Sequence, residues 1–200
     1  MIQHIPALEN ERARLQPLQI SDVEPLAAIA LNQPDLFLLT SLKLRQKGDV
    51  YSFVRKALDG MSDGTSIPFL VIDKPSGKIA GTTRFLSIAK EHKRVEIGGT
   101  WIASEFHGNG LNKAMKLLML QYAFETMDFN RVEFKINEIN NRSRKAVESI
   151  GATFEGILRH HMINDDGTIR NSVYYSIIKE EWPHIKQDVF GKYGTKANNT

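Results

Sequence analysis

The chain has 200 residues, of which 42% are hydrophobic and 24% charged, and these values fit one folded domain rather than a disordered chain. It contains no cysteine, which excludes disulfide frameworks, thiolate metal sites and a cysteine nucleophile. The net charge is +3, from 26 basic and 23 acidic side chains that are interspersed along the chain, so no nucleic-acid partner is expected.

The start of the chain predicts neither secretion nor membrane insertion. Residues 1–10 lack the basic segment followed by an apolar one that a secretory signal requires. The longest early apolar run, residues 26–31, is far shorter than the ~20 residues of a membrane-spanning helix. We therefore expect a cytoplasmic protein with no membrane partner.

The first half of the chain predicts one strand, two helices and a hairpin, from apolar periodicity, capping residues and turn sequences. In chain order these are an edge strand at 13–18, a helix from the caps Ser21 and Asp22 to about Leu31, a helix over 49–61, and strands at 67–72 and 78–88 around the turn Asp-Lys-Pro-Ser-Gly.

A third strand is predicted over 93–102, and its period of two separates an apolar from a polar face. The expected faces are Val95, Ile97 and Trp101 on one side and Arg94, Glu96 and Thr100 on the other. The pair Gly98-Gly99 in its middle indicates a bulge, or a close approach by another backbone or a ligand.

The second half predicts helices and strands in alternation, then a hairpin. The expected elements are a long amphipathic helix over 109–127, a strand at 132–136, a short helix over 140–150 closed by Gly151, and strands at 153–159 and 171–178. This order indicates an α+β or mixed α/β layer fold, in one domain over residues 1–189 followed by a mobile tail over 190–200.

The most informative segment leads from the third strand into the long helix. Gly108 and Gly110 precede the helix, whose free amides and positive dipole favour an anion, and Lys113 and Lys116 add positive charge. These features predict a phosphate or pyrophosphate site, although a tight strand–helix turn would use the same glycines. Neither the Walker loop nor the dinucleotide fingerprint fits, because Lys113 stands where each needs another residue.

Several motifs together resemble the GNAT acetyltransferase superfamily. They are Glu96-Ile97-Gly98, Trp101 and Gly108-Asn109-Gly110-Leu111-Asn112. Asn140-x-x-Ser143, Gly151-Ala152-x-Phe154-x-Glu155-Gly156 and Glu181-Trp182 narrow the resemblance to the branch of RimJ/RimL-type ribosomal-protein N-terminal acetyltransferases. The resemblance covers residues 13–183. It implies a central mixed, mostly antiparallel sheet of about seven strands flanked by about four helices.

The resemblance also implies acetyl-CoA as co-substrate, held where the parallel strands 93–102 and 131–136 splay apart, and no metal. The residues it assigns to the cofactor are Trp101, Ile102, Phe106, His107, Gly108, Asn109, Gly110, Leu111, Asn112, Lys113, Asn140, Ser143 and Lys145. Glu105 departs from the family, which usually has Gln or Arg there; we expect a change in affinity rather than lost binding, because the cradle is mostly backbone.

Two residues are candidates for the chemistry. The family often places a carboxylate at Glu96, which could be a general base, an electrostatic anchor for the amine, or only the ion-pair partner of Arg94. Ser143 could protonate the leaving thiolate or anchor it, or could instead bond backbone in the first turn of its helix. Asn140 suits both a helix cap and a cofactor contact.

Charged residues near these positions leave further alternatives open. Arg142, Arg144 and Lys145 could reach phosphates or form a solvated helix face. His160 and His161 are adjacent on a strand and point to opposite faces, so they suit the lining of an acceptor cleft better than a metal site.

The sequence therefore predicts an N-acetyltransferase in which a primary amine attacks acetyl-CoA directly in a ternary complex. The resemblance favours a protein N-terminus as acceptor. A small amine (polyamine, amino acid or aminoglycoside) and a non-catalytic acyl-CoA-binding regulator remain the alternatives. Members of the family often pair, so a homodimer is also compatible with the sequence.

Overall fold

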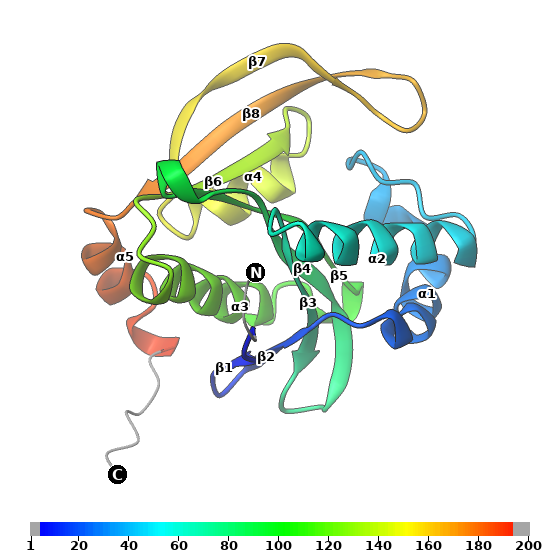
Figure 1. The fold of residues 1–200 in the computed structure, drawn as a ribbon, viewed down its shortest axis with the longest axis horizontal. Helices are drawn as coiled ribbons and strands as arrows, with labels where there is room; N and C mark the ends of the chain where they lie inside the picture. Colours follow the sequence, from blue (N-terminus) through cyan, green and yellow to red (C-terminus); the bar gives the residue numbers. More distant parts are fainter. Residues whose placement is uncertain (1–4, 194–200) are drawn as a thin grey trace.

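The computed structural model describes residues 5–193, which form one mixed sheet with helices on both faces (Figure 1). Eight strands pair in the order β1-β2-β3-β4-β5-β6-β8-β7, and only the β5–β6 pair is parallel. The strands are β1 (Leu8–Glu9), β2 (Ala13–Pro17), β3 (Ile67–Asp73), β4 (Lys78–Ala89), β5 (Arg94–Ile102), β6 (Arg131–Asn137), β7 (Thr153–Ile163) and β8 (Ile169–Ile178).

Five α-helices lie in the described part of the chain: α1 (Val23–Asn32), α2 (Lys47–Ser62), α3 (Leu111–Gln121), α4 (Asn141–Glu148) and α5 (Trp182–Asp188). A π-helical turn, Tyr122–Thr126, extends α3. The main hydrophobic core lies between the sheet and α3, where Leu111 and Met115 are fully buried. A second core joins α1 and α2 to the other face of the sheet, and Figure 1 shows these two helices on the right.

The predicted fold class is confirmed, and the structure has eight strands and five helices where about seven and four were expected. The segment 13–18 is not the edge strand. The two-residue strand β1 pairs outside it, with Leu8 opposite Leu15, and so short a strand leaves no alternation to detect in a sequence.

The predicted faces of β5 are correct only up to its glycine pair. Val95 and Ile97 pack in the core under α3, whereas Trp101 packs with α1 and α2 on the opposite face. Thr100 in turn lies on the α3 side, where it receives a hydrogen bond from Lys116. The register of β4 and β5 shifts at this point and Gly99 has a φ of +57°, so a bulge reverses which face each later side chain takes.

The domain extends past the predicted boundary at residue 189. Phe190 is only 1% exposed and packs on Trp182, and Gly191–Tyr193 forms a 3-10 turn. The sequence predicts this boundary too early because a single aromatic residue after a helix gives no periodic signal. Residues 194–200, the rest of the predicted tail, lie outside the described residues.

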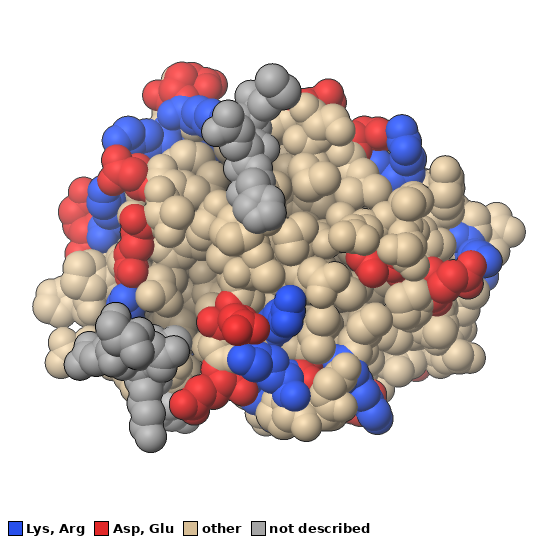
Figure 2. Space-filling view, turned by 60° about the horizontal axis from the view of Figure 1, so that its bottom comes forward, with Lys and Arg blue, Asp and Glu red and all other residues tan. Residues whose placement is uncertain are grey.

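Charges of both signs are intermingled on the face of the molecule drawn in Figure 2, with a broad uncharged area between them. Within residues 5–193, no helix combines the length and the apolar character that crossing a membrane requires.

Candidate functional site

The parallel strands β5 and β6 separate soon after they pair. Their register covers only three positions, from Arg94 opposite Arg131 to Glu96 opposite Glu133. Both strands then continue, to Ile102 and Asn137, without pairing to each other. The strands therefore leave a wedge between them, and the unpaired backbone edge of β5 can take an extended ligand by strand-like hydrogen bonding.

The loop before α3 presents free backbone amides. Gly108 and Gly110 have φ values of +74° and +91°, a left-handed conformation that glycine adopts without strain. Among the described residues no acceptor bonds the amides of Gly108, Asn109, Gly110, Asn112 and Lys113. The Asn109 side chain accepts only the amide of Leu111, at 3.1 Å. A row of amides at a helix start is suited to a phosphate or pyrophosphate.

Basic side chains on α3 and α4 are candidates to add charge at this loop. Lys113 and Lys145 form no ion pair with any described residue. Arg142 lies 3.4 Å from Nδ1 of His107, whose Nε2 lies 2.8 Å from the Ile102 carbonyl oxygen. Arg144 is engaged elsewhere, because it donates to the Tyr175 hydroxyl at 3.1 Å and to the Glu138 carbonyl at 3.3 Å.

Glu105, the departure from the family pattern, forms an ion pair with Lys78 at 3.4 Å. This contact holds the carboxylate beside β4 and partly neutralises it. An anion at the loop amides is therefore less affected by this acidic residue than the sequence alone suggests.

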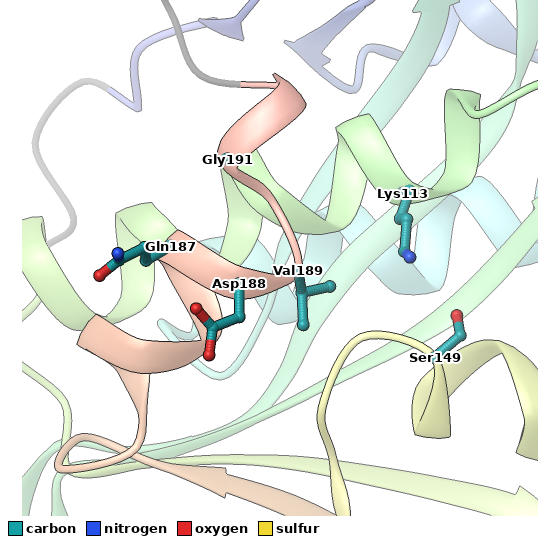
Figure 3. Close-up of a pocket in the computed structure, with 6 residues that line it drawn as sticks. All are labelled: Lys113, Ser149, Gln187, Asp188, Val189 and Gly191. Atoms are coloured by element: carbon teal, nitrogen blue, oxygen red, sulfur yellow. The ribbon is translucent and has the colours of Figure 1, made fainter.

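A pocket of about 390 Å³ lies beside the loop (Figure 3). Lys113 on α3 and Ser149 after α4 extend into it from opposite sides, and Val189 borders it. The C-terminal segment also reaches the loop itself, since a Cβ atom on Gly110 would lie 3.3 Å from the Tyr193 hydroxyl. The sequence does not predict this contact, because it assigns Tyr193 to the tail over 190–200.

Glu96 is 6% exposed and forms an ion pair with Lys135 of β6, at 3.3 Å. The expected partner, Arg94, pairs with Glu133 instead, also at 3.3 Å. Room for the Glu96 carboxylate comes from Gly98, where a Cβ atom would lie 2.9 Å from Glu96 Oε1. Glu96 therefore lies directly at the bulge of β5, on the side away from α3.

Asn140 caps α4, because its Oδ1 accepts the backbone amide of Ser143 at 3.0 Å. Its amide group lies 3.5 Å from the Leu39 carbonyl oxygen. The half-buried hydroxyl of Ser143 has no hydrogen bond to any described residue, so the expected alternative, a side-chain bond to backbone, is not formed.

Four apolar residues assigned to the cofactor are buried in the protein, namely Trp101, Ile102, Phe106 and Leu111. Their side chains belong to the two cores, so only their backbone can face a ligand. Asn112 and His107 remain at the surface of the loop with Gly108 and Asn109.

The expectation that Lys116 adds charge to the anion site is wrong. The residue is 5% exposed under β5, where its Nζ donates to Thr100 Oγ1 at 3.1 Å and lies 5.9 Å from the centre of the Phe134 ring. Burial lowers the pKa of Lys116 to about 7. Lys116 therefore lies on the inner face of α3. The spacing of the apolar residues Leu111 and Met115 does not predict this.

His160 and His161 lie in the bulge of β7 between Leu158 and Met162, where His160 has a φ of +51°, so regular strand alternation does not apply to them. The backbone amide of His160 donates to Asn171 in a bulge of β7, and the His161 ring packs edge-on against Tyr174, 5.7 Å between centres. Within residues 5–193 no group of three or more His, Cys, Asp or Glu side chains is arranged to hold a metal ion.

Known acetyltransferases are similar to this chain in sequence and in structure. A family model described as an acetyltransferase (GNAT) domain matches residues 12–153. The chain is 35% identical over 106 residues to the Bacillus subtilis protein named "Putative ribosomal N-acetyltransferase YdaF", an alignment that spans 53% of this chain and 57% of YdaF.

Solved structures match over almost the whole chain. A GCN5-related N-acetyltransferase from Brucella melitensis has a TM-score of 0.86 at 26% identity, over 96% of this chain and 86% of that one. RimJ of Mycobacterium smegmatis, solved in complex with CoA-disulfide, has a TM-score of 0.80 at 20% identity, over 95% and 96% of the two chains. At that identity the second match concerns the fold alone.

Proposed function

The chain belongs to the GNAT family of acetyltransferases and is an acyltransferase, and from that premise we propose that it moves an acetyl group from acetyl-CoA to a protein N-terminal α-amine. The observation that carries the proposal is the combination of free amides before α3 with a wedge between β5 and β6. One site suits a pyrophosphate and the other an extended pantetheine arm.

The cofactor's phosphates would lie at the loop from Gly108 to Lys113. Lys113, Arg142 and Lys145 would add charge, and the pocket between Lys113 and Ser149 offers room beside it for the remaining phosphate or the adenine. The arm would then follow the free edge of β5 toward the bulge at Gly98-Gly99. This route brings the thioester near Glu96 and the start of α4.

The reaction requires three contributions from the protein. As the amine nitrogen bonds the acetyl carbon, the carbonyl oxygen becomes negative, and a backbone amide of the β5 bulge would stabilise it. The carbon–sulfur bond then breaks, and Ser143, whose hydroxyl has no partner among the described residues, would donate a proton to the thiolate. Glu96 would accept the proton that the amine loses, or hold the amine by its charge.

The demand on Glu96 depends on the acceptor. An α-amine has a pKa of about 7.7–8.0, so roughly a tenth is unprotonated at pH 7, whereas a lysine amine near 10.4 is almost entirely protonated. A carboxylate of ordinary basicity is therefore sufficient for an N-terminus. The name of the relative YdaF also points to a ribosomal protein as acceptor. A small amine and a non-catalytic acyl-CoA-binding role are the competing functions.

Titration calorimetry with acetyl-CoA, with ATP and NAD as controls, tests the cofactor. We expect micromolar binding, about −8 kcal/mol, that neither control matches. Transfer is then measured with peptides that have free or blocked N-termini. No binding at about 1 mM, or equal binding of ATP, would reject the proposed function.

A further inference from the structure

We propose that the acceptor carries a carboxylate close to its reacting amine, and that Arg84, Lys135 and Arg170 recognise this group. The inference rests on the proposed function, because it takes Glu96 at the β5 bulge as the place where the amine reacts. It selects an N-terminus with an acidic residue in its first positions, and it excludes polycations such as polyamines and aminoglycosides.

Four charged side chains from four strands share the sheet face opposite α3. Glu96 of β5 pairs with Lys135 of β6, whose neighbour in the register is Tyr174 of β8. Arg170 lies on the same face of β8 as Tyr174, since alternate residues of a strand share a face. Arg84 of β4 lies against the bulge, where a Cβ atom on Gly99 would come 2.6 Å from its Nε.

The cluster holds three cations and one carboxylate. Glu96 makes its ion pair with Lys135, and no hydrogen bond or ion pair to Arg84 or Arg170 is formed by the residues that the structure describes. The Nε atoms of both arginines are buried without a partner, and Arg170 is only 7% exposed as a whole. The guanidinium carbon of Arg84 lies over the Phe53 ring, 5.3 Å from its centre.

Neighbouring acidic groups do not balance this charge. Glu133, which stands opposite Glu96 in the register of β5 and β6, is held by Arg94 and Arg131, and Arg131 also pairs with Glu155. Those two arginines and two glutamates neutralise one another. The excess of two positive charges therefore stays with Arg84, Lys135 and Arg170, beside the Glu96 carboxylate.

Burial without a partner is costly for a guanidinium, which indicates a ligand rather than a structural role. Burial lowers the pKa of Arg84 and of Arg170, and the nearby Glu96 only partly opposes this. A guanidinium fork bonds a carboxylate at two points, so an acceptor carboxylate would satisfy the free donors. A second cation brought into this cluster would instead add repulsion.

Space for an acceptor chain lies along β7. A hollow of about 520 Å³ is lined by Ile157, Leu158, Arg159 and His160. Arg159 and His160 lie at the start of a bulge in β7. Before the bulge Leu158 pairs with Ser172 of β8, and after it Met162 pairs with Arg170. The hollow is thus next to the part of β8 that carries Arg170, and Arg159 adds a further positive charge to it.

The test uses peptides that begin Ser-Asp, Ser-Asn and Ser-Lys and are otherwise identical, because the first two differ in charge and hardly in shape. Binding to the protein loaded with CoA is measured by calorimetry, and transfer is measured as kcat/KM. We expect the Asp peptide to exceed the Asn peptide at least tenfold in both, and the Lys peptide to be poorest. Serine and serinamide form a second pair, which tells whether a free amino acid supplies the carboxylate.

The variant Arg170→Gln should remove the preference for Asp over Asn, because it raises KM for the Asp peptide. Arg84→Gln provides a second test, and Arg14→Gln, an exposed position on β2, is the control. If the Asp and Asn peptides bind equally, and serine and serinamide bind equally, the inference is overturned. If only serine is preferred over serinamide, the acceptor is a free amino acid and the choice of a peptide is overturned. Charge-dependent binding without transfer would uphold the anion site and reject the proposed activity instead.

Discussion

Glu96 and Glu133 face each other as the last residues at which β5 and β6 pair. Their surroundings differ although their register is the same. Glu96 has one cation, Lys135, in contact and lies against the glycines of the bulge, whereas Glu133 is bonded by Arg94 and Arg131. One carboxylate is thus kept in the wedge with part of its bonding capacity free, and the other is used to hold strands together.

This difference predicts the effect of the same substitution at the two positions. Glu96→Gln should lower kcat about 100-fold or more, because the amide cannot take the amine's proton. Its affinity for acetyl-CoA should not change. Glu133→Gln should leave kcat near that of the parent and lower only the melting temperature. Steady-state kinetics with one peptide acceptor checks both, and equal losses of kcat in the two variants would remove Glu96 from the chemistry.

Gly108 and Gly64 allow a controlled test of the phosphate loop. Both have a φ of +74° and both have no atom within 4 Å of an added Cβ. Phenylalanine at either position should therefore cost a similar amount of stability, about 1–2 kcal/mol of left-handed backbone strain. Only Gly108→Phe places a ring over the free amides before α3, so only this variant should lose acetyl-CoA binding.

Calorimetry and thermal melting of the two variants compare binding with stability. If Gly64→Phe weakens acetyl-CoA as much as Gly108→Phe does, strain and not obstruction is the cause. If neither variant weakens it, the cofactor's phosphates lie elsewhere.

Much of the fold could be predicted from the sequence because local patterns specify it. The helix over 47–62 follows from apolar spacing, and the hairpins follow from their turn residues. The reversal of faces after Gly99 could not be predicted in the same way. A glycine pair indicates a bulge. Which face of the sheet each later side chain takes, however, depends on how many residues the neighbouring strand skips at the bulge.

The part of the candidate site that the backbone forms could be predicted from the sequence. The part formed by side chains from distant segments could not. The glycine loop could be located from its own sequence. By contrast, Arg84, Lys135 and Arg170 come from three strands, and nothing in the sequence around any one of them points to the other two. Only the strand order β4-β5-β6-β8 brings them to Glu96, and that order is set by long-range pairing.

Asn140 has two proposed roles that one pair of substitutions separates. Asn140→Ala removes the cap of α4 and should cost about 1 kcal/mol of stability. Asn140→Asp keeps an oxygen that accepts the Ser143 amide, so the melting temperature should stay near that of the parent. If the Asn140 amide also contacts the cofactor, the Asp variant still loses acetyl-CoA affinity. Unchanged affinity in the stable Asp variant would leave capping as its only function.

Lys116 predicts an unusual dependence of stability on pH. Its pKa is about 7 in the folded protein and 10.5 in the reference state, so the unfolded chain binds more protons between these values. The free energy of unfolding therefore rises with pH across this range, by up to about 1.4 kcal/mol per pH unit. Below about pH 7 lysine is protonated in both states, and the full cost of burying its charge remains.

The variant Lys116→Met removes this contribution, since methionine fills a similar volume without a charge. It should be more stable than the parent at about pH 6, and the difference should shrink as the pH approaches about 10. Urea unfolding at several pH values measures the effect, with Lys113→Met, one turn earlier and half-buried, as the control. A constant difference between Lys116→Met and the parent at all pH values would mean that the buried lysine keeps its proton through the bond to Thr100.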